Sequence, residues 1–297
     1  MADDRPIDDL EFDQLMAGVG LGHEGPRLAV AVSGGPDSLA LAFLARRWVE
    51  RRSGVLVGLT VDHGLRPEAT AEAAFVKSLF GGWGLDHETL IWRPSGIGGA
   101  GQAAARKARY DLLLEACQRW TIFQLVIGHN QGDQGETLLQ RLERQSGAVG
   151  LPAMRQAALR ADVRLLRPLL SLPKPRLMAT CAKAGIEPVN DPSNVDDRFD
   201  RPALRGMLNH QNPSRQARRH DALYSAAGRA SEVASRLERR ASEIQLACTL
   251  VRPHGYVWLD PVCLARTTPL VAERVLARII GAVGGGDFLR GATLSDL

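Results

Sequence analysis

Short apolar runs alternate with amphipathic stretches through the first two hundred residues of the chain. The apolar runs predict strands at residues 27–32, 55–61, 87–92 and 123–129. The stretches between them predict helices from about Ser38, over 68–80 and over 101–120. Apolar strands that alternate with helices are typical of a parallel sheet covered on both faces. With right-handed crossovers, this pattern predicts an α/β fold built on a doubly wound sheet.

The pattern changes near Asn212, after the stretch "QNPS". An Ala- and Arg-rich segment then predicts one long helix, residues 254–260 predict part of a hairpin, and a last helix begins at Pro269. We therefore expect a first domain over residues 1–211 and a smaller, mainly helical region over residues 212–297.

The composition agrees with a folded globular protein of two domains. The chain has 297 residues, of which 45% are hydrophobic and 24% charged. It contains no apolar run of 18 residues, and its acidic start lacks the basic and apolar regions of a signal peptide. We expect a cytoplasmic protein without a membrane partner, and the sequence leaves its oligomeric state open.

The four cysteines are Cys117, Cys181, Cys248 and Cys263, and they are far apart in the sequence. No C-x-x-C pair occurs, so the spacing suggests neither a zinc site nor a disulfide framework. We expect all four to be buried thiols.

Basic residues are concentrated in the second half of the chain. The formal net charge is only +4, but residues 198–240 contain ten arginines and four acidic residues. Such a segment is typical of a surface that binds a polyanion. It is equally compatible with a solvated helix whose arginines pair locally.

The stretch "SGGPDS", residues 33–38, follows the first predicted strand and opens a helix. Backbone N–H groups at such a position favour an anion, and Gly34 and Gly35 would let the backbone approach it closely. Pro36 suits the first helical turn, and Asp37 could meet a metal that accompanies a phosphate. The stretch matches neither a Walker A loop nor a dinucleotide fingerprint. The alternative is a simple turn between strand and helix.

This loop resembles the SGGxDS loop of the PP-loop ATP pyrophosphatases. The stretches "VDHGLRPEA", "AARKARY", "GHNQGDQGETLLQRLERQSGAVGL", "RPLL" and "NDPSNVDDRFDRPALR" follow it in the order and approximate spacing of the tRNA(Ile)-lysidine synthetase family. The resemblance covers roughly residues 28–210. It implies ATP as a substrate, with Mg²⁺, L-lysine and a tRNA(Ile) that carries a CAU anticodon.

The resemblance also assigns roles to residues of the first two strand ends. It implies that ATP is held by Ser33, Gly34, Gly35, Pro36, Asp37, Ser38, Asp62, His63 and Arg66. Asp37 would also be the metal ligand. From the residues alone, Asp62 and His63 could equally form a turn, and Arg66 could cap a helix.

Residues 128–137 follow the fourth predicted strand. Asp133 and Glu136 stand where a helix should begin, and we expect them at its N-cap and N3 positions. Beside His129, the same two carboxylates could instead bind the ammonium group of a lysine substrate. The resemblance implies a catalytic set of Asp37, His129, Asp133 and Glu136. Asn130 and Gly132 depart from the family pattern, which puts in doubt any role of an acidic group at position 132.

Arginines form the remaining candidate surface. Arg106 and Arg109 are three residues apart on one predicted helix, where they could clamp a phosphate or simply extend into solvent. The expected tRNA-binding set is Arg106, Arg109, Arg201, Arg205, Arg215, Arg218 and Arg219. Gln102 and Pro202 replace a Glu and an Asn that are usual in the family.

The implied reaction is an ATP-dependent ligation of lysine to the wobble cytidine of the tRNA, which forms lysidine. The alternatives are another PP-loop tRNA-modifying enzyme of the thiolase type and a noncatalytic nucleotide- or RNA-binding relative. A thiolase needs grouped or catalytic cysteines, which the spacing of the four cysteines does not offer. The retained loop at residues 33–38 disfavours a noncatalytic relative.

Overall fold

A computed structural model describes residues 4–62, 64, 67–93, 102–143, 154–189, 213–252, 254 and 256–284. The chain divides into two compact units. Met1–Glu136 and Arg155–His220 form the first, and Thr137–Met154 and Asp221–Leu297 form the second. The expected boundary between residues 211 and 212 lies outside the described residues and stays a prediction.

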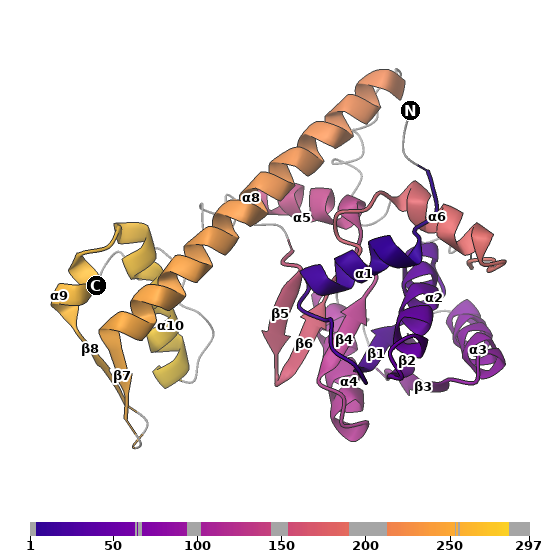
Figure 1. Cartoon of the computed structure of the whole chain (residues 1–297), viewed down its shortest axis with the longest axis horizontal. Helices are drawn as coiled ribbons and strands as arrows, with labels where there is room; N and C mark the ends of the chain where they lie inside the picture. Colours follow the sequence, from indigo (N-terminus) through magenta and orange to yellow (C-terminus); the bar gives the residue numbers. More distant parts are fainter. Residues whose placement is uncertain are drawn as a thin grey trace. The chain divides into compact units, whose positions relative to one another are not determined.

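The first unit is built on a six-stranded sheet in the order β3-β2-β1-β4-β6-β5 (Figure 1). Its strands are β1 Arg27–Ala31, β2 Val55–Asp62, β3 Asp86–Ile91, β4 Gln124–Ile127, β5 Ala157–Arg160 and β6 Val163–Leu166. All neighbouring strands are parallel except β5 and β6. The four strands predicted from the apolar runs are confirmed, and so is the parallel sheet.

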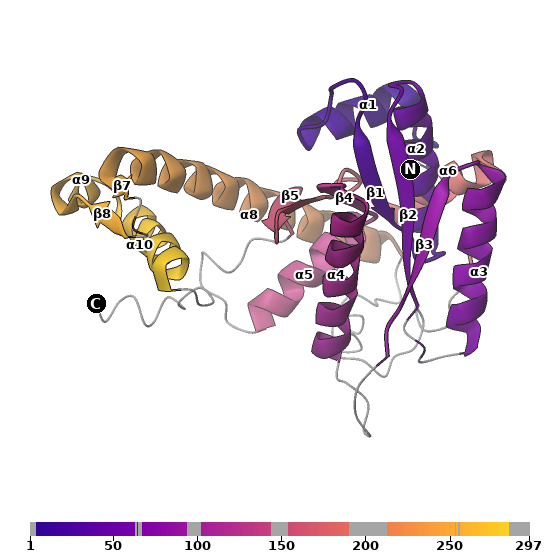
Figure 2. The same ribbon diagram turned by 90° about the horizontal axis from the view of Figure 1, so that it is seen from below.

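Helices cover both faces of this sheet, as expected for a doubly wound fold (Figure 2). One core combines alternate β1 residues such as Leu28 and Val30 with side chains of four helices. These helices are α1 Asp9–Gly18, α2 Pro36–Glu50, α3 Pro67–Gly82 and α6 Lys174–Lys183. On the opposite face, Ala29 packs with α4 Gln102–Arg119. The helix α5, Gln131–Glu143, follows β4.

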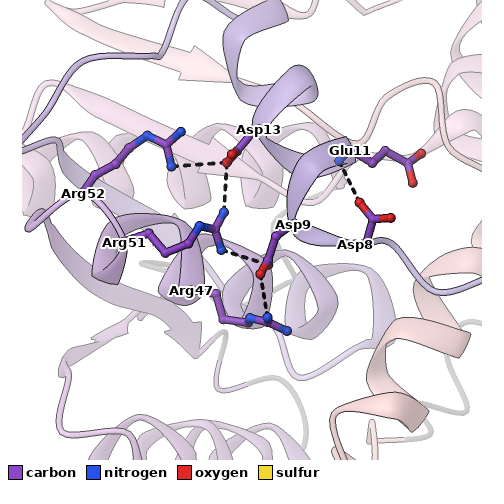
Figure 3. Close-up of polar contacts among 7 residues, drawn as sticks. All are labelled: Asp8, Asp9, Glu11, Asp13, Arg47, Arg51 and Arg52. Carbon is purple, nitrogen blue, oxygen red and sulfur yellow. Dashed lines mark hydrogen bonds and ion pairs between the residues drawn. The ribbon is translucent and has the colours of Figure 1, made fainter.

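The helix α1, which forms from the acidic start of the chain, was not among the elements predicted from the sequence. Its carboxylates pair with basic side chains at the end of α2 (Figure 3). Asp9 contacts Arg47 at 2.6 Å and Arg51 at 2.9 Å, and Asp13 contacts Arg51 at 2.9 Å and Arg52 at 3.2 Å. The acidic start is therefore neutralised within the first unit.

A second contact joins α1 to α6. Arg176 is 8% exposed and donates from both terminal nitrogens to the two Glu11 carboxylate oxygens, each at 2.6 Å. The Ile7 N–H donates to the Thr180 hydroxyl at 3.0 Å. Residues 7–18 therefore tie together α2 and α6.

The β5–β6 hairpin and α6 were also absent from the predicted elements. The hairpin turns at Ala161 and Asp162, which have φ of 43° and 64°. Two-residue turns of this hand are usually recognised by Asn-Gly or Asp-Gly. Ala-Asp does not carry that signal, so the turn could not be read from the sequence.

The long helix, the hairpin and the last helix predicted after Asn212 are present as α8 Pro213–Cys248, β7 Thr249–Val251 with β8 Val257–Leu259, and α10 Pro269–Gly284. The short helix α9 Pro261–Ala265 was not predicted. From Asp221 onward, these elements belong to the second unit. Ala241, Leu264, Val271 and Val275 form its buried core. No helix in the described part of the chain is long and apolar enough to cross a membrane.

The expectation of four buried thiols is wrong for two cysteines. Cys248 and Cys263 form a disulfide with their Cα atoms 5.5 Å apart. The β7–β8 hairpin reverses the chain between them, so that the Asp260 N–H donates to the Cys248 carbonyl at 2.9 Å. A separation of 15 residues gave no local signal for this pairing. Cys117 and Cys181 are buried thiols, as expected.

Candidate active site

The loop between β1 and α2 is closed by its own hydrogen bonds. The Ser33 N–H donates to the Ser38 hydroxyl oxygen at 3.1 Å, and that hydroxyl donates to the Gly35 carbonyl at 3.0 Å. Gly34 has a φ of +83°, a conformation that favours glycine, and its carbonyl accepts from the Val189 N–H. No described side chain caps α2, so the first turn can offer N–H groups to an anion.

Asp37 lies in the first turn of α2, and one of its two carboxylate oxygens is unsatisfied. Its Oδ1 atom is buried and has no hydrogen-bond partner among the described residues. Burial raises the pKa of Asp37, while the charge of Lys174 and a hydrogen bond from the Asn130 side chain oppose that rise. A buried oxygen without a donor is a suitable ligand for a cation.

The residues present fit a magnesium ion that arrives with the nucleotide. No cluster of three or more His, Cys, Asp or Glu side chains able to hold a metal occurs in the described part of the chain. Mg²⁺ is commonly held by one or two carboxylates together with substrate phosphates. The single carboxylate of Asp37 beside a phosphate-type loop matches that arrangement.

Gly128 brings the end of β4 against the start of α2. A Cβ atom at this position would lie 2.9 Å from the Asp37 carbonyl oxygen and 3.0 Å from the Ser38 Cα. Any side chain here would displace the loop backbone. Gly128 therefore sets the distance between β4 and the loop, although it is not among the site residues predicted from the sequence.

The expected capping positions of α5 are wrong by three residues. Asn130 is the N-cap residue, because its Oδ1 accepts from the N–H groups of Gly132 at 2.6 Å and Asp133 at 3.3 Å. Asp133 occupies N3, and its Oδ2 accepts from the Asn130 N–H at 2.8 Å, which completes a reciprocal capping box. Glu136 follows one turn later in the helix. Asn130, a departure from the family pattern, thus links the α5 cap to Asp37.

His129 lies among arginines from two parts of the first unit. Arg167, which follows β6, donates from Nε to His129 Nδ1 at 3.1 Å. Burial lowers the pKa of His129 to about 3, and the charges of Arg167, Arg106 and Arg109 act in the same direction. His129 is therefore neutral at physiological pH. This part of the site favours anionic groups.

Asp62 lies at the end of β2 and is engaged by its own chain. Its two carboxylate oxygens accept from the Gly64 N–H at 2.9 Å and from the Thr70 hydroxyl at 3.1 Å. These contacts fit the turn-forming alternative for Asp62. His63 and Arg66, the other candidates at this strand end, lie outside the described residues.

The expected tRNA-binding arginines are only partly described. Arg106 and Arg109 are exposed on α4, and the Arg106 guanidinium lies 5.6 Å from the centre of the Tyr110 ring. Arg201 and Arg205 lie outside the described residues. The backbones of Arg215, Arg218 and Arg219 lie in α8, and their side chains lie outside the described part.

Several arginines of the second unit pair locally. Arg236 contacts Glu232 at 2.6 Å, and Arg240 contacts Glu243 at 2.9 Å. Glu238 accepts from Arg274 and Arg278 of α10. For this part of α8, the structure favours the local-pairing alternative.

Three further residues of the site were not among the candidates. Arg167 belongs to the quoted stretch "RPLL", where its apolar neighbours conceal it, and Asn130 was noted only as a departure from the family pattern. Lys174 begins α6 and acts electrostatically on Asp37. Lys174 and Asp37 are more than a hundred residues apart in the sequence, so no local pattern could reveal that they lie close together.

Comparisons with known proteins agree with this geometry. The sequence model of a family described as a PP-loop domain matches residues 7–212. The chain is 39% identical over 294 residues to the tRNA(Ile)-lysidine synthase of Bradyrhizobium sp. (strain BTAi1). The alignment covers 95% of this chain and 80% of that protein. It is 50% identical over 185 residues to the tRNA(Ile)-lysidine synthase of Rhodopseudomonas palustris. That alignment covers 62% of this chain and 54% of that protein.

A solved structure has a similar fold. The U34-tRNA thiolase NcsA from Methanococcus maripaludis, with its 4Fe–4S cluster, superposes with a TM-score of 0.61 over 75% of this chain and 78% of that chain. Its sequence identity of 14% supports the fold alone. The family match and the lysidine synthase relatives, together with the loop at Ser33–Ser38, show that this chain belongs to the PP-loop family of tRNA(Ile)-lysidine synthases.

Proposed function

We propose that this protein ligates lysine to the wobble cytidine of the CAU anticodon of tRNA(Ile), using ATP. The observation that carries this proposal is 39–41% identity to tRNA(Ile)-lysidine synthases along 95% of the chain. The loop at residues 33–38, with the unsatisfied oxygen of Asp37, supports ATP as the activating substrate. We expect the reaction to take place in the cytoplasm, with tRNA and ATP as its substrates.

In the first step, the cytidine carbonyl oxygen attacks the α-phosphorus of ATP and pyrophosphate leaves. Backbone N–H groups and hydroxyls of Ser33–Ser38 would bind the leaving phosphates and stabilise their growing charge. Asp37 would hold Mg²⁺, which supplies positive charge at those phosphates when it is bound. Lys174 would act on the same phosphates from the start of α6.

In the second step, the lysine amine attacks the activated pyrimidine carbon. A C–N bond forms, the C–O bond to the leaving group breaks, AMP departs, and the amine loses a proton. Asp133 and Glu136 would bind the lysine and could accept that proton. The capping contact from Asp133 Oδ2 to the Asn130 N–H holds its carboxylate in place.

The proposed contacts with tRNA and ATP extend beyond this centre. Arg106 and Arg109, with the arginines at 201, 205, 215, 218 and 219, would contact tRNA phosphates. Asp62, His63 and Arg66 would lie beside the nucleotide at the end of β2. Asp62 would act there through the turn that it forms with Gly64.

The thiolase alternative is disfavoured by the cysteines of the first unit. Burial raises the pKa of Cys117 to about 12, and burial together with the Asp37 charge raises that of Cys181 to about 11. Sulfur transfer through a persulfide requires a thiolate, which these values disfavour at neutral pH.

The reaction can be tested by incubating the protein with ATP, labelled lysine and a tRNA(Ile) transcript bearing the CAU anticodon. Digestion to nucleosides should yield labelled lysidine only when ATP is present. A tRNA with cytidine 34 changed to uridine provides the control. ATP turnover without label in the nucleosides would contradict the proposal.

A further inference from the structure

His129 and Arg167 are brought together by the order of the strands. β4 and β6 are parallel neighbours, with Val126 opposite Leu166. The residues that follow the two strands therefore emerge at the same edge of the sheet. There the Arg167 Nε donates to His129 Nδ1 at 3.1 Å.

Several contacts fix the position of Arg167. It is 7% exposed, its Nη1 donates to the Arg155 carbonyl at 2.9 Å, and its backbone N–H donates to the Gln156 carbonyl at 2.8 Å. Within the described part of the chain, its guanidinium contacts the His129 ring and a backbone carbonyl and no carboxylate. Burying such a group is costly, so a role in function would account for its presence.

The contact determines which nitrogen of His129 carries the proton. A guanidinium only donates, so Nδ1 must present its lone pair. The single proton of the neutral ring is then on Nε2. A second proton on Nδ1 would break the contact and place two positive charges about 3 Å apart. Arg106 and Arg109 of α4 oppose that proton as well.

We propose that Arg167 is a positioning residue that fixes His129 as a neutral hydrogen-bond donor, so that Nε2 binds a negatively charged substrate oxygen. This inference rests on the proposed function and narrows the role of His129. Nε2 already carries a proton and cannot accept one from the lysine amine. The acceptor is an oxygen of the ATP phosphates or of the lysine carboxylate.

The first test does not depend on activity. In the ¹⁵N-labelled protein at pH 7, long-range ¹H–¹⁵N correlation spectra should show His129 with a bare Nδ1 and a protonated Nε2. The Arg167→Met variant should lose this single tautomer, and the pKa of its His129 should rise. An Nδ1–H tautomer or an imidazolium in the unmodified protein at pH 7 would overturn the proposal.

A matched variant controls for general loss of structure. Arg164→Met removes an arginine of the adjacent strand β6, which also donates to a backbone carbonyl, that of Val19 at 3.1 Å. It should leave the His129 spectrum unchanged. Arg167→Gln serves in case Arg167→Met does not fold, and it should also lose the single tautomer, because its amide can accept from Nδ1 as well as donate to it. Retention of the wild-type spectrum by Arg167→Gln would contradict the positioning role.

The second test compares substitutions of His129 in the ligation assay. Gln retains an N–H donor, so His129→Gln should keep more activity than His129→Ala, for which we expect a loss of about 100-fold in kcat. Arg167→Met should lower kcat by about 10- to 100-fold through misplacement of the ring. Equal losses of kcat in His129→Gln and His129→Ala would contradict the proposed role of His129 as a hydrogen-bond donor.

The substrate that meets Nε2 can be identified in the same assay. If the partner is an ATP phosphate, His129→Ala, which removes the donor, raises the KM for ATP; if it is the lysine carboxylate, the KM for lysine rises. A rise in neither would contradict the proposed acceptor. Should the unmodified protein form no lysidine, the proposed function fails while the spectra still decide the tautomer.

Discussion

Asp37 is an ionisable residue whose immediate surroundings in the protein leave one oxygen unsatisfied. Its raised pKa means that folding penalises the ionised form, so the native state loses stability as pH rises above the ordinary aspartate range. We expect Asp37→Asn to melt at a higher temperature than the unmodified protein at pH 7.5, and the difference to shrink as the pH falls. The same variant should lose pyrophosphate release that depends on tRNA.

Thermal melting at several pH values and a pyrophosphate assay measure these two effects. The combination separates a functional carboxylate from a structural one, because functional groups are often retained at a cost in stability. A lower melting temperature with normal pyrophosphate release would show that Asp37 only supports the fold.

Gly128 tests whether close backbone packing sets the geometry of the loop. A Cβ 2.9 Å from the Asp37 carbonyl oxygen must displace the start of α2. We expect Gly128→Ala to lower the free energy of unfolding by about 1–3 kcal/mol and to raise the KM for ATP. Gly81→Ala is the control, since an added Cβ there has no neighbour within 4 Å. Urea unfolding and ATP titrations measure the two effects. Equal free energies of unfolding and equal KM values for ATP in the two variants would contradict this role of Gly128.

The helix α1 joins the first unit through two kinds of ion pair. Glu11 meets the buried Arg176, whereas Asp9 meets the more exposed Arg47 and Arg51. We expect Glu11→Gln to cost about 1–3 kcal/mol of unfolding free energy, because it leaves a buried guanidinium short of a partner. Asp9→Asn should cost about 0.2–1 kcal/mol and lose its effect in high salt.

Urea unfolding at low and high sodium chloride concentration distinguishes the two pairs. The effect of Glu11→Gln should change little with salt because Arg176 is shielded from solvent. Equal costs that vanish together in high salt would mean that both pairs act as surface contacts.

The elements with regular apolar periodicity were predictable, and those that depend on distant contacts were not. The strands at 27–31 and 55–62 and the loop between β1 and α2 follow from local pattern. The α1 helix was not predicted, because the arginines that pair with its Asp9 and Asp13 are 38 residues away in the sequence. Arg167 and His129 are likewise 38 residues apart, and only the order of strands reveals their contact.

For the whole molecule, binding of tRNA should depend on the basic start of α8. Replacement of Arg215, Arg218 and Arg219 by Gln should weaken binding of cognate and noncognate tRNA alike, while ATP binding survives. Each lost phosphate contact should reduce the slope of log affinity against log salt by roughly one. Filter binding over a range of salt concentrations measures this slope.

Arg236→Gln provides the control, because Arg236 already pairs with Glu232 at 2.6 Å. It should leave the slope unchanged. If the triple variant keeps full tRNA affinity and the original slope, this part of α8 is a solvated helix without a tRNA contact.

In the proposed mechanism, one protein adenylates the tRNA and then replaces AMP with lysine. The most direct test of this mechanism uses ATP labelled at the α-phosphate and tRNA(Ile) with a CAU anticodon, first without lysine. The label should become attached to the tRNA, and added lysine should release it as AMP while lysidine forms in equal amount. If the labelled phosphate never becomes attached to the tRNA, or if added lysine fails to release it as AMP, the proposed mechanism is contradicted.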